Sequence, residues 1–102
     1  MTTELRYLDF DYSEDTEGHG TFDAMASTTP DRTPEVQAEI AQVLAWAEAV
    51  FPDARGALEE GGVWDYDLQQ TQEEDARFVT CTLSLSGTAD FCAALREQFA
   101  LD

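Results

Sequence analysis

The chain contains no lysine and no asparagine, and its only basic side chains are five arginines. Because 22 acidic residues oppose them, the formal net charge is −17. Direct binding of nucleic acid or of an anionic membrane needs a basic surface, which this composition excludes. The charge instead allows attraction to a basic protein, although solubility or a salty cytoplasm would explain it without any partner.

Histidine occurs once, as His19, so a histidine-rich metal site is excluded. We expect His19 to be an exposed turn residue, and we predict neither a metal nor a cofactor. The two cysteines, Cys81 and Cys92, lack CxxC spacing and lie in apolar runs, which predicts buried free thiols in a reducing, cytoplasmic compartment. A disulfide between them is the geometric alternative.

Long apolar runs are missing as well. No stretch approaches the roughly 18–20 residues that span a bilayer, and the N-terminal segment lacks the basic and apolar regions of a secretory signal. Phosphate-binding loops and dinucleotide fingerprints are also absent from the sequence. What is present, 43% hydrophobic and 11% aromatic residues over 102 positions, predicts a single folded domain spanning 1–102.

The first half of the chain predicts, in order, a strand, a turn, a strand and a helix, over residues 4–12, 13–20, 21–29 and 34–51. Alternation places Leu8 and Phe10 on one face of the first strand, with Asp9 and Asp11 on the other. Thr33 is the expected N-cap of the helix, followed by a proline at its first position. Its apolar stripe consists of Val36, Ile40, Val43, Leu44, Ala47, Val50 and Phe51.

The second half predicts strands over residues 63–70 and 76–86 and a helix capped by Thr88. Placed on the first half at an offset of 56, it matches LDFDY (8–12) with WDYDL (64–68) and Phe22 with Phe78. We therefore predict a tandem ββα-ββα repeat, with halves at about 4–51 and 63–101 joined by the loop 52–62.

This element order predicts an α+β fold, in which one face of a four-stranded antiparallel sheet carries both helices. The favoured strand order is 1-2-4-3, a circular permutation of the ferredoxin-like sheet. The Asp-x-Asp pairs would then lie on the two edge strands, where charge discourages aggregation. The rival order, 2-1-3-4, would bring Asp9, Asp11, Asp65 and Asp67 together in the middle of the open face, the side of the sheet that the helices leave uncovered.

The segment YLDFDYS, residues 7–13, resembles the aspartate motif of haloacid-dehalogenase-type phosphatases. The resemblance implies Asp9 as nucleophile, Asp11 as general acid and a magnesium ion between them. That family also has a basic residue that holds the phosphate, a later acidic pair and a larger α/β domain. This chain has no lysine, and its second Asp-x-Asp segment, WDYDLQ, lacks the hydroxyl residue. We therefore predict no catalytic residue.

The aromatic residues predict a surface of another kind. Tyr7, Phe22, Trp46, Trp64 and Phe78 are too many to lie beneath two helices on one sheet face. We therefore expect an apolar patch on the open face, suited to a partner or to a homodimer.

Together these features predict a small, non-enzymatic, protein-binding module for a basic partner, such as a prokaryotic immunity or inhibitor protein or a DNA mimic. The alternative is a small ligand-binding protein or enzyme with a pocket between the helices and the sheet. The predicted partner-binding surface combines acidic edges, an acidic turn and exposed aromatics: Asp9, Asp11, Glu14, Asp15, Glu17, Asp65, Asp67, Phe22 and Phe78.

Overall fold

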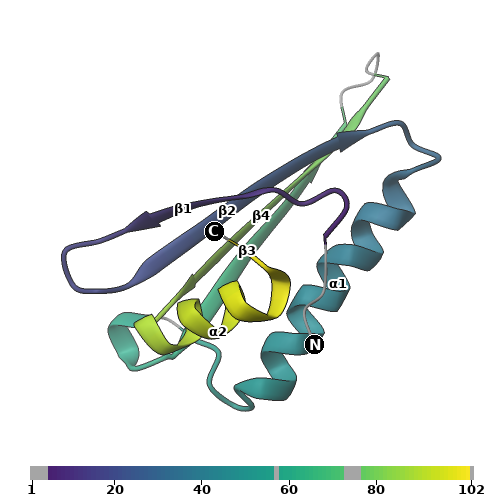
Figure 1. Cartoon of the computed structure of the whole chain (residues 1–102). Helices are drawn as coiled ribbons and strands as arrows, with labels where there is room; N and C mark the ends of the chain where they lie inside the picture. Colours follow the sequence, from purple (N-terminus) through teal and green to yellow (C-terminus); the bar gives the residue numbers. More distant parts are fainter. Residues whose placement is uncertain (1–4, 57, 73–76, 102) are drawn as a thin grey trace.

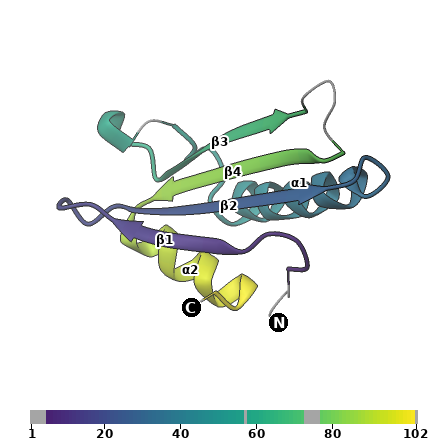
Figure 2. The ribbon, with the colours of Figure 1, turned by 90° about the horizontal axis from the view of Figure 1, so that it is seen from above.

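Four strands form one antiparallel sheet in the order β1-β2-β4-β3 in the computed structural model, which describes residues 5–56, 58–72 and 77–101 (Figure 1). Both helices lie on the same side of this sheet, as the view from above shows (Figure 2). The predicted fold class and strand order are thereby confirmed. The elements are β1 (Phe10–Glu14), β2 (Gly20–Thr28), α1 (Thr33–Val50), the short 3₁₀ helix η1 (Leu58–Glu60), β3 (Trp64–Thr71), β4 (Val79–Gly87) and α2 (Ala89–Phe99).

The two central strands alternate between buried and solvent-facing side chains. β4 buries every second residue, and β2 does the same along most of its length. Their register pairs Phe22 with Leu85 and Ala24 with Leu83, so the buried residues of both strands share one face. This face meets α1, whose buried apolar residues recur every three or four positions: Val36, Ile40, Val43 and Ala47.

The start of α1 differs from the prediction by one residue. The N-cap is Arg32, which makes no side-chain cap hydrogen bond, and Thr33 is the first helical residue. The Thr33 hydroxyl instead donates to the carbonyl oxygen of Thr29 at 3.3 Å. Thr88, by contrast, caps α2 as predicted, because its hydroxyl accepts from the backbone N–H of Phe91 at 3.4 Å.

Two glycines allow α2 to lie close against the sheet. Gly20 and Gly87 are register partners on β2 and β4. A Cβ atom at Gly20 would lie 2.7 Å from the Cys92 sulfur, and one at Gly87 would overlap the ring of Phe91. The Phe91 ring can therefore stack on Trp64, with ring centroids 5.6 Å apart and planes 2° from parallel.

Replacing Gly87 with alanine should destabilise the fold by about 1–3 kcal/mol, because the new methyl group overpacks against Phe91. Chemical denaturation of both forms measures the difference. Gly56→Ala is the matched control, since nothing lies within 4 Å of a Cβ at Gly56. Equal stability of the two variants would contradict the close packing of α2.

Glu39 ties the N-terminal segment to α1. Its carboxylate accepts the backbone N–H groups of Arg6, Tyr7 and Leu8 at 2.8, 3.0 and 2.8 Å. Although its side chain is acidic, Glu39 is only 8% exposed. The predicted strand over 4–12 was therefore too long: β1 begins only at Phe10, because the preceding N–H groups bind a carboxylate rather than a neighbouring strand.

Glu39→Ala should lower the free energy of unfolding by about 3 kcal/mol, because it leaves three backbone N–H groups, of which that of Leu8 is buried, without an acceptor. Glu39→Gln should lower the free energy of unfolding by less, since its amide oxygen can still accept hydrogen bonds from these N–H groups. Thermal or urea unfolding distinguishes the two. Gln42→Ala, at an exposed position of the same helix, should change the stability by no more than about 0.5 kcal/mol.

The structure does not confirm the predicted sequence repeat. The order strand, strand, helix does occur twice. However, the offset of 56 matches Phe22, which is 1% exposed within β2, with Phe78, which is 51% exposed and precedes β4. The helices also differ in length, with 18 residues in α1 and 11 in α2. Glu4 and Ala76, at the ends of two predicted strands, lie outside the described residues.

Candidate functional site

The side of the sheet opposite the helices, which we call the open face, carries a row of acidic side chains. The strand registers place Asp11 beside Asp23, Asp23 beside Ser84, and Ser84 beside Asp67. This row crosses all four strands from one edge to the other. Its three aspartates are exposed, and the Ser84 hydroxyl donates to the Asp23 carboxylate.

Hydroxyl groups fill much of the remaining open face. Thr21 and Ser86 lie side by side, with their hydroxyl oxygens 3.2 Å apart. Ser27 and Thr80 form a similar pair at 2.8 Å near the other end of the central strands. The open face therefore offers hydroxyls, which donate and accept, next to carboxylates, which only accept.

The acidic row has no counter-charge on the sheet. None of the four strands contains a basic residue. The ion pairs between arginine and glutamate found among the described residues lie elsewhere: Arg32–Glu35 and Arg55–Glu48. Because Asp11 and Asp23 are direct cross-strand partners, their like charges are unfavourable in the free chain. A cationic group placed over them would relieve this repulsion.

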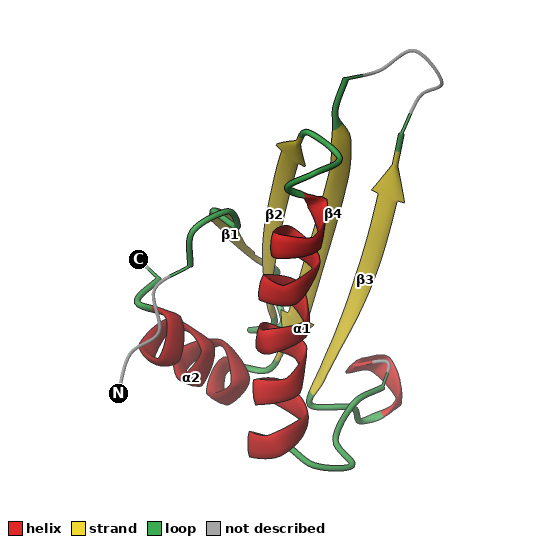
Figure 3. Cartoon of the chain, turned by 90° about the vertical axis from the view of Figure 1, so that its right-hand side faces the viewer, coloured by secondary structure: helices red, strands yellow, loops and turns green. Residues whose placement is uncertain are grey.

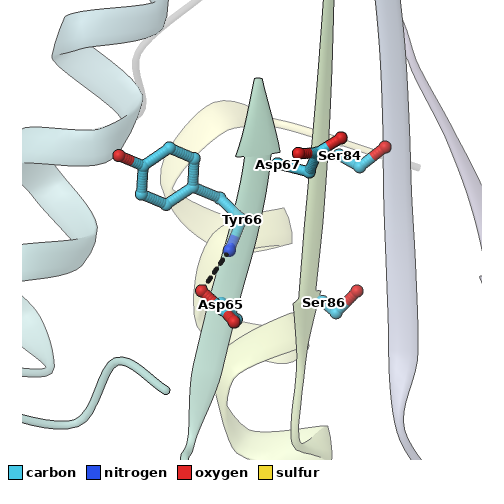
Figure 4. A pocket seen from close by; sticks show the side chains of 5 residues that line it. All are labelled: Asp65, Tyr66, Asp67, Ser84 and Ser86. Atoms are coloured by element: carbon cyan, nitrogen blue, oxygen red, sulfur yellow. Dashed lines mark hydrogen bonds between the residues drawn. The ribbon is translucent and has the colours of Figure 1, made fainter. Parts of the chain in front are cut away.

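Two shallow hollows lie on the open face, one beside each edge strand. The first, beside β3, has a volume of about 180 Å³ and is lined by Asp65, Tyr66, Asp67, Ser84 and Ser86 (Figure 4). The second, beside β1, has a volume of about 320 Å³ and is lined by Asp9, Asp11, Asp23, Ala24, Met25 and Thr82. Each hollow therefore contains one Asp-x-Asp pair: Asp65 and Asp67 on β3, or Asp11 on β1 with Asp9 just before that strand.

The two Asp-x-Asp pairs do not converge. β1 and β3 are opposite edges of the sheet, so the rival order, with four aspartates in the middle, is wrong. On β3, the Asp65 carboxylate accepts the N–H of Tyr66 at 2.9 Å (Figure 4). This contact occupies a backbone donor of an edge strand, in addition to the charge that the edge-protection interpretation expects there.

Sequence reasoning missed Asp23, the central aspartate of the row. The signal was available, because apolar and polar or exposed residues alternate in FDAMA at 22–26, which places Asp23 on the other face of the strand from Phe22 and Ala24. A single aspartate between apolar residues is a weaker signal than an Asp-x-Asp pair that occurs twice.

The acidic turn between β1 and β2 is a separate feature. Asp15 accepts the backbone N–H groups of Glu17 and His19 at 2.9 and 2.8 Å, and its second oxygen lies 3.6 Å from the His19 ring nitrogen Nδ1. Side-chain ligand atoms of Asp15, Glu17 and His19 all lie within 4.8 Å of one another. The backbone N–H of His19 lowers the pKa of Asp15, with a smaller contribution from that of Glu17. The arrangement is that of a side-chain-stabilised turn.

Of the two aromatic residues in the predicted surface, the structure buries Phe22 and exposes Phe78. Phe22, placed in that surface, is 1% exposed, because strand alternation directs it toward the helices. Trp64 is also buried, and Tyr7 and Trp46 are half-buried against the core. Phe78 alone of these five residues is exposed, at 51%.

No protein family, no curated protein and no solved structure matches this chain. Within the described residues, no helix has the length and apolar character needed to cross a membrane.

The lowered pKa of Asp15 predicts how the turn responds to acid. A depressed folded-state pKa stabilises the fold above the unfolded value of about 3.9, and this contribution is lost as the pH falls through the folded-state pKa. The amide NMR signals of Glu17 and His19 should therefore shift with a midpoint below about 3.9. Asp15→Asn keeps an acceptor oxygen that does not titrate, so the same transition should disappear; its persistence would assign the transition to another group.

Proposed function

We propose that this chain is a non-enzymatic module that binds a basic protein through its open face, as an inhibitor, an immunity protein or a DNA mimic would. The observation that carries the proposal is the row Asp11, Asp23, Ser84 and Asp67, which spans the sheet without a basic residue in any strand.

The width of the row supports a protein partner over a single ion. Neighbouring strands lie about 4.8 Å apart, so the outer aspartates Asp11 and Asp67 are separated by roughly 14 Å. One cation cannot contact both, whereas several lysine or arginine side chains of one partner can. Arginine suits this face especially, because its planar guanidinium donates to two oxygens at once.

The other interpretations have less support. In a homodimer through the open face, acidic rows would oppose each other, and the exposed apolar side chain on β2 is Met25 alone. A ligand pocket between helices and sheet would need space that Trp64, Leu83 and Phe91 fill, each 0% exposed. The two cysteines are free and buried, which fits the reducing, cytoplasmic location that we propose.

The proposal is tested by capturing partners from a lysate with the native chain and with a triple variant, Asp11→Asn, Asp23→Asn and Asp67→Asn. We expect a basic protein to be captured by the native chain at low salt and released at high salt, because screening weakens exposed charge pairs. The triple variant should bind that protein about tenfold more weakly, at a typical contribution of 0.2–1 kcal/mol per exposed pair.

A matched control removes the same number of charges away from the sheet: Glu48→Gln, Asp53→Asn and Glu97→Gln. These positions are exposed, on α1, after α1 and on α2. The control should retain the partner with little loss. Equal weakening by both triple variants, or no salt-sensitive basic partner at all, would contradict the proposed function.

A further inference from the structure

The outer edge of β3 is free of other strands along most of its length. Its start is covered, because the N–H of Gly56 donates to the Trp64 carbonyl at 2.9 Å. Beyond that point, the described chain places no segment beside it (Figure 3). The Val63 carbonyl faces the opposite way and accepts the N–H of Thr88, at the end of β4.

These two hydrogen bonds determine which backbone groups point outward. Both backbone groups of a residue in an antiparallel strand point to the same side, and successive residues alternate. Since the Trp64 carbonyl points outward, the backbone N–H and carbonyl groups of Tyr66, Leu68 and Gln70 point outward as well. Asp65 occupies the N–H of Tyr66, which leaves the Tyr66 carbonyl and both groups of Leu68 and Gln70 for a further strand.

The side chains along this edge differ between the two faces of the sheet. Asp65 and Asp67 flank it on the open face, where they line the hollow beside β3. On the helix side lie Tyr66, half-buried, and Leu68, 44% exposed. A segment with alternating basic and apolar side chains would match both faces at once, whereas an acidic segment would be repelled.

We propose that the basic partner binds by adding an extended segment, with alternating basic and apolar residues, to the free edge of β3. This inference rests on the proposed function and names the form of the partner. β3 suits it better than β1, the other edge strand, because β3 has eight residues and β1 has five. Main-chain hydrogen bonds to Leu68 and Gln70 supply part of the affinity, and the aspartates supply the charge selectivity.

The probe is the peptide Lys-Val-Lys-Val-Lys-Val-Lys, compared with Lys-Lys-Lys-Lys-Val-Val-Val, which has the same composition without the alternation. Titrations are followed by NMR at about 0.15 M salt, where screening confines charge effects to within about 8 Å. We expect the alternating peptide to bind more tightly. It should slow hydrogen exchange at the Leu68 and Gln70 amides, while the inward-pointing Gln69 amide stays unchanged.

Two variants with equal charge change separate this edge from the rest of the open face. Asp65→Asn with Asp67→Asn should weaken the alternating peptide about tenfold, and Asp11→Asn with Asp23→Asn less than about twofold. Asparagine retains an acceptor oxygen at each position, so the hydrogen bonds to Tyr66 and Ser84 can persist.

The outcomes distinguish this inference from the proposed function. Strand addition would be overturned if both double variants weakened peptide binding equally, if the two peptides bound equally, or if hydrogen exchange at the Leu68 amide did not change. Each of these results would leave the open face as a binding surface. Strand addition would also be overturned if a captured basic protein bound the variant Asp65→Asn with Asp67→Asn as tightly as it binds the native chain. Absence of any basic partner, with no peptide binding, would overturn both.

Discussion

The position of α2 depends on two glycines that lie side by side on the central strands. Gly20 and Gly87 leave the room that Cys92 and Phe91 occupy, so the helix approaches the sheet closely enough for Phe91 to stack on Trp64. Side chains at these positions would overlap Cys92 and Phe91 unless α2 moved away from the sheet. With both helices packed on one face, the other face stays uncovered. The acidic row is therefore accessible because of apolar packing on the far side of the sheet.

Period-two alternation made the fold predictable, because it marks strands and assigns their faces without knowledge of tertiary contacts. The strand order followed from chain connectivity and from the charges placed at the edges. Alternation does not indicate the hydrogen bonds that side chains make to backbone groups, whether these groups are near or far along the chain. Glu39 ends the strand character of residues 6–8, and Thr33 donates to Thr29 instead of capping α1. Such choices depend on which groups meet after folding.

The acidic part of the site was predictable for the same reason, since Asp9, Asp11, Asp65 and Asp67 alternate with apolar residues. The aromatic part was not. Two helices do not cover all five rings, since Phe78 is exposed, but which rings they cover depends on packing: Trp46 lies between the helices, with ring centroids 5.5 Å from Phe99 and 6.2 Å from Phe91. The row across the sheet also needed the register between strands, which pairs Asp11 with Asp23. Sequence separation alone does not indicate that these two carboxylates are neighbours.

The carboxylate of Glu39 has a consequence for the order of folding. It lies 31 to 33 residues along the chain from the amides that it binds, so its acceptor site exists only once α1 has formed. Closing a loop of that length costs entropy before any contact repays it. Residues 6–8 leave the ribosome before α1, yet they must wait for it to reach their final place. Residues 6–8 therefore reach their final backbone hydrogen bonds only after the chain has been synthesised as far as Glu39.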